Sequence, residues 1–181
     1  MFHLANRELS VDVLDPADRI DATRQGTRYC WGGYIWQIHD ARFGPLLRGP
    51  EWPNPAPLAF NGQGLPESFR HRTRDGQPLT WQGDRGVALG AGALSADTAG
   101  NITLTAPCAW TVTPAADALG FHTRHTAAGF SYALERRLEL RDRTVTSSTR
   151  LTNLGGSPLV LQWFAHPFWA CLLYTSPSPR D

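Results

Sequence analysis

Polar and apolar residues alternate along much of the chain, most clearly toward its C-terminal end. Residues 144–153 place one set of side chains on each side of an extended backbone and are rich in Thr, which favours strands. The segment 153–158 is a turn signal, and a second apolar run, 159–164, leads directly to His166 and Pro167. Proline biases the residue before it toward extended backbone. The sequence therefore predicts a strand, a turn and a second strand that presents an imidazole at its end.

The rest of the chain has the pattern of short strands separated by turns, with almost no helix. Residues 2–14 are expected to form a first strand or a hairpin, and the polar segment 17–27 a short helical turn or a loop. Short strands with turn signals about every eight to twelve residues are typical of a sandwich or a barrel. We therefore predict an all-β, antiparallel β-sandwich. The other predicted strands are 79–82, 86–94, 101–106, 110–113, 119–126 and 130–140.

Segment 28–40 carries a strong signal for a pair of strands around two adjacent glycines. Glycines at this position favour a tight bend or a bulge. By the two-residue period of a strand, Tyr34, Trp36 and Ile38 are expected to share one face.

A proline-rich segment, 50–57, interrupts the strand pattern and leads into the Gly-rich stretch 58–70. Four prolines in eight residues exclude a helix and a central strand, so we expect an extended loop. Long ordered loops often carry function. Gly62 and Gly64 either let the backbone approach a ligand closely or serve only in turns, and both interpretations stay open. No βαβ pattern surrounds them, which argues against a dinucleotide site.

Composition excludes several classes of partner. The formal net charge is +1, so electrostatics give no reason to expect nucleic acid or an anionic membrane as a partner. All 17 basic residues are arginine and are spread over the chain, which is typical of a solvated surface. No apolar run approaches the ~18 residues that a membrane-spanning helix needs. Seven tryptophans are many for this length and suit either a core or stacking on sugars.

Cysteine usage favours a reduced, cytoplasmic protein. The chain opens without the apolar stretch of a secretory signal, and Cys30 and Cys108 are the only cysteines before residue 171. No Cys-x-x-Cys or zinc-type spacing occurs. His122 and His125 are three residues apart on a predicted strand and so face opposite sides. We expect no metal and no cofactor.

One motif links the chain to a known family. Thr152-Asn153-x-Gly155-x-x-Pro158, then an apolar strand and His166-Pro167-Phe168, resembles the aldose 1-epimerase, or galactose mutarotase-like, superfamily. The resemblance is good over 134–169 and loose over 28–169. It implies a large antiparallel β-sandwich with the sugar site across one concave sheet. It also implies that His166 is the general acid that protonates the sugar ring oxygen; the alternative is a histidine buried at a strand end.

The resemblance also suggests binding residues. Arg70 matches an N-terminal-half arginine that hydrogen-bonds sugar hydroxyls in the family, and a surface arginine is the alternative. His71 is a candidate second site histidine, although the family's usual Asn-x-Leu-His-Gly-Gly segment is absent, which favours a divergent branch. Glu67 is expected to bind or orient the sugar, or else to be a solvated loop carboxylate. The family's general base is a glutamate nearer the C-terminus, and no residue here matches it.

Two functions follow as expectations. The first is an isomerase of the aldose 1-epimerase type, which interconverts the anomers of a hexose or related small sugar by general acid and base catalysis. A phosphosugar variant is not favoured, because no cluster of basic residues occurs in the loops. The second is a non-catalytic carbohydrate-binding sandwich, whose candidate stacking residues are Trp36, Trp52, Trp163 and Trp169.

The last eleven residues, 171–181, do not continue the strand pattern. Back-translation of CLLYTSPSPRD matches the end of a transposase-type sequencing adapter, codon by codon. We therefore interpret 1–170 as part of a mutarotase-like sandwich domain and 171–181 as a non-native tail; a natural Ser/Pro-rich terminus is the alternative. On that view the domain is truncated at its C-terminus, the general base is missing and this fragment is inactive.

Overall fold

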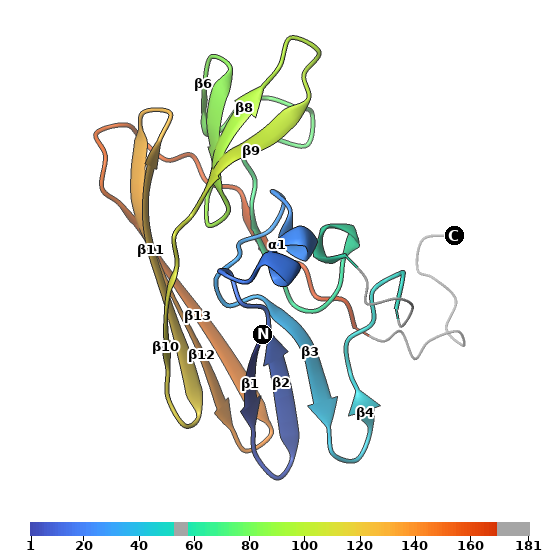
Figure 1. Ribbon diagram of the computed structural model, residues 1–181. Coiled ribbons are helices and arrows are strands. Elements are labelled where there is room, and N and C mark those ends of the chain that lie inside the picture. Colours follow the sequence, from blue (N-terminus) through green and yellow to red (C-terminus); the bar gives the residue numbers. More distant parts are fainter. Residues whose placement is uncertain (53–57, 170–181) are drawn as a thin grey trace.

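The computed structural model describes residues 1–52 and 58–169, and its architecture is all-β and antiparallel (Figure 1). This confirms the predicted fold class. Part of the proline-rich loop, 53–57, and the predicted adapter tail, 171–181, lie outside the described residues.

Two four-stranded antiparallel sheets form the body of the molecule, with strand orders β1-β2-β3-β4 and β10-β11-β12-β13. The segments predicted as a first hairpin and as the strand 144–153 are found in these sheets as expected. The strands of the first sheet are β1 (Phe2–Ala5), β2 (Leu9–Val13), β3 (Ile35–Asp40) and β4 (Gly44–Pro45). Those of the second are β10 (Thr111–Pro114), β11 (Ala118–Ala127), β12 (Phe130–Arg141) and β13 (Thr144–Asn153).

The core lies between these two sheets. Alternate residues of β2 are buried, and they pack in one cluster with Phe121 of β11 and with Leu138 and Leu140 of β12. Fully burying a large aliphatic or aromatic side chain stabilises a fold by about 1.5–3 kcal/mol. Burial of these alternating positions therefore holds the two layers together as a sandwich.

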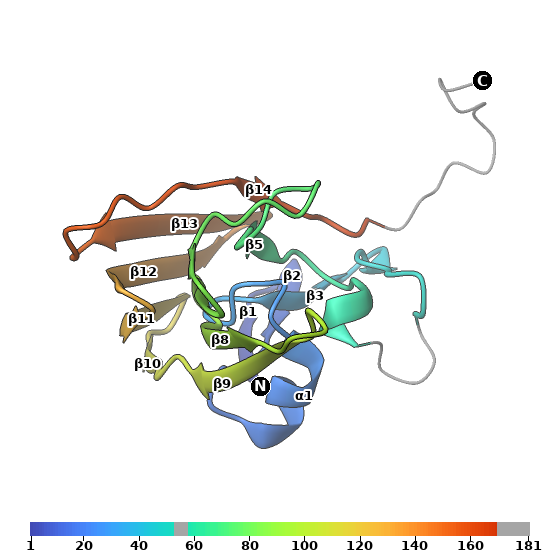
Figure 2. The ribbon, with the colours of Figure 1, turned by 90° about the horizontal axis from the view of Figure 1, so that it is seen from above.

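A third sheet, β6-β7-β8-β9, lies at the end of the sandwich nearest the helix (Figures 1 and 2). Here the prediction of one strand over 86–94 was wrong, because β7 and β8 form a hairpin that turns at Gly90, with φ +81°. A Cβ on Gly90 would lie 2.4 Å from the sulfur of Cys30, so this turn needs glycine. The strands are β6 (Trp81–Gln82), β7 (Arg85–Ala88), β8 (Gly92–Ala96) and β9 (Ile102–Pro107).

The prediction for 28–40 was only half right. Residues 28–34 form turns and loop, and β3 begins at Ile35. A bulge opposite Asp12 and Val13 shifts the pairing register, so that Ile35 and Ile38 both join the sandwich core. Trp36 packs with Tyr34 in a separate buried cluster. The expectation that Tyr34, Trp36 and Ile38 share one face is therefore wrong, because a bulge changes the alternation of side chains.

Short helices complete the described chain. Of the two alternatives for 17–27, a helical turn or a loop, the structure has the helix α1 (Arg19–Gln25). Asp18 caps it, because its carboxylate accepts hydrogen bonds from the backbone N–H groups of Ile20 and Asp21. A 3-10 helix, η1 (Ala59–Asn61), follows the proline-rich loop. Neither of these helices has the length and apolar character needed to cross a membrane.

A two-stranded ribbon of β5 (Glu67–Phe69) and β14 (Trp163–Ala165) connects the Gly-rich stretch to the His166 motif. The predicted strand 159–164 is thus confined to its last residues. On both sides of β14 the pairing continues through single backbone bonds, from Arg70 N–H to Gln162 and from Phe168 N–H to Gly64. The ribbon brings together the two segments that hold all of the predicted site residues.

Candidate functional site

The ribbon has two faces, and its register decides which candidate residues meet. Glu67 pairs with Ala165 and Ser68 with Phe164, and the His166 N–H donates to Pro66 O at 2.9 Å. Residues that pair across an antiparallel ladder point to the same side, and neighbours along a strand point to opposite sides. His166 therefore shares a face with Phe164 and Ser68, and Glu67 lies on the other.

We call the first side the histidine face; its members are Ser68 and Arg70 from one segment and Phe164, His166 and Phe168 from the other. The His166 ring stacks on Phe168, with centroids 4.4 Å apart and planes 17° from parallel, and contacts Phe164 at 5.8 Å. Tyr29 meets the same imidazole edge-on at 6.2 Å. Three aromatic rings therefore fix a half-buried imidazole at the end of the ribbon.

Electrostatics around His166 favour its neutral form. Partial burial, and then the positive charge of Arg28, hold the pKa of His166 below its usual value of 6.5. Protonated, such an imidazole is a stronger acid than free histidine. The ring can therefore hold and release a proton, which is the capability that the resemblance implies for it.

Arg70 and His71 line a cavity of about 500 Å³ beside Phe164. The Arg70 guanidinium lies over the Phe164 ring, 5.1 Å from its centroid, which puts it on the histidine face. His71 is held differently, because its Nδ1 accepts a hydrogen bond from Trp81 Nε1 at 3.1 Å. Burial, and then Arg72, lower the pKa of His71 to about 4, so this ring is neutral at pH 7 and carries its proton on Nε2.

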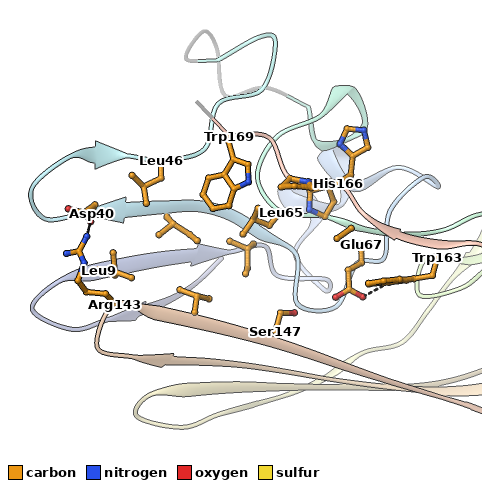
Figure 3. A pocket seen from close by; sticks show the side chains of 16 residues that line it. Leu9, Asp40, Leu46, Leu65, Glu67, Arg143, Ser147, Trp163, His166 and Trp169 are labelled. Carbon is orange, nitrogen blue, oxygen red and sulfur yellow. Dashed lines mark hydrogen bonds and ion pairs between the residues drawn. The ribbon is translucent and has the colours of Figure 1, made fainter. Parts of the chain in front are cut away.

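The opposite side, the tryptophan face, comprises Trp163, Ala165, Pro167 and Trp169 together with Glu67. It borders a second cavity, of about 450 Å³, whose floor is mostly aliphatic (Figure 3). Trp163 and Trp169 are 53% and 55% exposed at its edge. The His166 ring points away from Glu67, although both residues border this cavity (Figure 3). The aliphatic residues are Leu9, Ile35, Ile38, Leu46, Leu65 and Val145.

Glu67 belongs to a buried polar network. Its Oε1 accepts from Arg136 Nη2 at 2.6 Å, and Thr149 Oγ1 lies 3.0 and 2.9 Å from the two carboxylate oxygens. Trp163 Nε1 donates to Oε2 at 3.1 Å. The Arg136 side chain is 1% exposed, and Ser147 Oγ also accepts from it at 3.0 Å. This network orients Trp163 and leaves Glu67 as a fixed carboxylate under the tryptophan face.

The structure thus places His166 and Arg70 on one face, His71 in the cavity beside Arg70, and Glu67 on the opposite face. Over 64–70 and 162–168, the positions that share the histidine face carry no carboxylate. The ribbon therefore supplies no general base next to His166. Of the tryptophans considered for sugar stacking, Trp36 is buried and Trp52 is half-buried.

Three arginines near the site, Arg28, Arg72 and Arg136, are not among the residues predicted from the sequence. Arg136 has a sequence signal, because it occupies an inward position of β12 between Leu134 and Leu138. A charge at such a position implies a buried partner. Arg28 and Arg72 have no comparable signal, because only the fold brings the loop after α1 next to the end of β5.

Comparison with protein-family models, with curated proteins and with solved structures gave no match.

Proposed function

We propose that this chain is a carbohydrate-active protein of the aldose 1-epimerase type, with His166 as the general acid. The observation that carries the proposal is the histidine face itself. It combines an imidazole fixed between aromatic rings with Arg70, a planar donor that forms no ion pair among the described residues. Aromatic surface beside hydrogen-bond donors suits a sugar, which has an apolar ring face and an edge of hydroxyls.

In the proposed reaction, His166 protonates the ring oxygen of the sugar as the bond from C1 to that oxygen breaks. A base removes the proton of the C1 hydroxyl, which gives the open-chain aldehyde. Rotation about the bond from C1 to C2 and reversal of both proton transfers yield the other anomer. His166 supplies one of the two transfers, and Arg70 holds hydroxyl groups of the sugar. The 181-residue chain is therefore expected to bind sugar without substantial turnover.

The test is a titration of the histidine NMR signals with galactose and with glucose, alongside polarimetry. Saturable shifts of the His166 signal, absent from the exposed His122, are the expected result. The variant His166→Asn should remove the shifting signal, and His122→Asn should leave it in place. If neither sugar moves the His166 signal, or if both histidines shift equally, the proposal is wrong.

A second candidate is a non-catalytic sugar-binding module that uses the tryptophan face. The exposed rings of Trp163 and Trp169 beside a cavity of about 450 Å³ favour it, and Glu67 fixes the orientation of Trp163. On this view Trp163→Ala abolishes sugar binding measured by tryptophan fluorescence, whereas His166→Asn has no effect. Phe43→Ala, at an exposed aromatic residue of the turn before β4, is the matched control.

A further inference from the structure

Three arginines that lie apart in the sequence line one cavity. Arg28 follows α1, and Arg70 and Arg72 follow β5; all three border the cavity of about 500 Å³ next to Phe164. None of its lining residues is acidic. The loops do contain a basic cluster, therefore, although it is visible only after folding.

The charges of these arginines have no carboxylate partner within residues 1–52 and 58–169. Six other arginines in that part of the chain form ion pairs with Asp or Glu: Arg24, Arg136, Arg137, Arg141, Arg143 and Arg150. Three like charges at one cavity repel one another, and this repulsion is relieved when an anion binds. Other described arginines also lack an ion pair, but Arg28, Arg70 and Arg72 are distinguished because their charges share one cavity without an acidic residue.

Aromatic rings fix the three guanidinium groups. Arg28 lies over Tyr29 at 5.1 Å, Arg70 over Phe164 at 5.1 Å and Arg72 over Trp81 at 4.4 Å from the ring centroids. Stacking holds the plane of a guanidinium and leaves its N–H edge for hydrogen bonds. The arrangement is thus ordered before any ligand binds, which lowers the entropy cost of binding.

One donor in the cluster lacks a partner. Arg72 Nη1 donates to Gly76 O at 3.2 Å, but its Nε is buried and has no hydrogen bond. A buried donor without an acceptor is unfavourable, and a small shift of the Arg72 side chain toward a ligand oxygen would relieve the penalty. Arg72 also contributes, after burial, to the lowered pKa of the neighbouring His71, so its charge acts on a second residue that lines this cavity.

We propose that Arg28, Arg70 and Arg72 bind the oxyanion of a charged sugar, a phosphoryl or carboxylate group, whose ring lies at His166. Phe164 joins the two parts of this site, because it lines the cavity and also contacts the His166 ring. Planar guanidinium groups recognise tetrahedral and planar oxyanions through paired N–H donors. The sugar part rests on the proposed function, whereas the anion part rests on the cavity alone.

The first experiment is calorimetric titration of the 181-residue protein with inorganic phosphate at constant ionic strength. Saturable binding is expected, and Arg70→Gln and Arg72→Gln should each weaken it by about tenfold or more. Arg74→Gln is the matched control, since Arg74 is exposed on the same segment outside the cavity.

A further variant, Arg70→Lys, keeps the positive charge but not the paired N–H donors, and it should give an intermediate loss of phosphate affinity. Circular dichroism confirms that each variant is folded. Absence of saturable binding, or an equal loss in Arg74→Gln, overturns the proposal.

The second experiment compares glucose 6-phosphate, glucuronate and glucose. One of the two charged sugars should bind at least about tenfold tighter than glucose, and Arg72→Gln should abolish that difference. The preferred one identifies the source of the oxyanion. If neither charged sugar binds more tightly than glucose, the charged-sugar proposal fails, whether or not the neutral sugar binds. If inorganic phosphate binds but no sugar shifts the His166 signal, the anion cavity stands and the proposed function fails.

Discussion

Arg136 and Glu67 form a buried ion pair between two parts of the sandwich that are 69 residues apart in the sequence. Both side chains are almost fully buried, and Ser147 and Thr149 of β13 complete their hydrogen bonds. Breaking a buried pair from one side leaves an uncompensated charge in the interior. At this residue scale, the polar network is a structural requirement of the fold.

Glu67→Gln should therefore lower the free energy of unfolding by about 3–5 kcal/mol, because Arg136 would keep its buried charge without a counter-charge. Urea denaturation followed by circular dichroism measures this change. Glu139→Gln is the control, since Glu139 pairs with Arg137 at the surface, and it should have little effect. Equal losses in the two variants would show that the buried pair of Glu67 and Arg136 contributes no more to the free energy of unfolding than a surface pair does.

His71 gives a second prediction, on the dependence of stability on pH. Its folded pKa is about 4, while the unfolded chain titrates near 6.5. Between these values the unfolded state binds a proton that the folded state does not, so stability is lost as the pH falls from about 6.5 to 4. With allowance for solvent screening, the loss from this one group is roughly 2 kcal/mol.

His71→Gln tests this prediction, because its amide oxygen can still accept from Trp81 Nε1 but does not titrate. Urea unfolding at pH 7 and at pH 4 should show a smaller loss of stability in the variant than in the parent protein. Identical losses in both proteins would mean that His71 protonates freely in the folded state.

At the scale of elements, the ribbon of β5 and β14 depends on one close approach. Gly64, with φ +77°, lies so near β3 that a Cβ there would be 2.1 Å from Ile35 O. Gly76 has a similar φ of +85° but open space around it. The two glycines therefore separate the effect of a clash from the effect of backbone strain.

Gly76→Ala should cost only the strain of a left-handed alanine, roughly 1–2 kcal/mol. Gly64→Ala should cost clearly more and should also broaden or shift the His166 NMR signal, because the ribbon has to move away from Ile35. Thermal unfolding and histidine NMR measure the two effects. If Gly64→Ala behaves like Gly76→Ala in both, the ribbon is not fixed by this contact.

These elements also show which parts of the fold and of the candidate site could be predicted from the sequence. The long strand β13 and the first hairpin follow from alternation and turn signals, because both depend on neighbours along the chain. The face assignment in β3 failed because one bulge reverses the alternation beyond it. Glu67 and His166 were both proposed for the site, but only the register of β5 and β14 shows that they point to opposite sides. Contacts across many residues, such as Glu67 with Arg136, leave only a weak trace in a single sequence.

At the scale of the whole molecule, the stretch between β13 and β14 exposes apolar surface. Val160 and Leu161 are 54% and 47% exposed, and β13 is an edge strand of its sheet. Exposed apolar side chains next to a strand edge favour association with other chains. We therefore expect the 181-residue chain to self-associate reversibly as its concentration rises.

The double variant Val160→Lys/Leu161→Lys should shift the sedimentation profile toward monomer, since two charges on this stretch repel a second copy and remove apolar contacts. Thr98→Lys/Ala99→Lys adds the same charge at the exposed turn before β9 and should leave association unchanged. An equal shift in both variants would mean that net charge controls association. A parent chain that stays monomeric at all concentrations would contradict the prediction. The edge of β13 would then be protected already, by the segment 154–162 that runs along it in Figure 2.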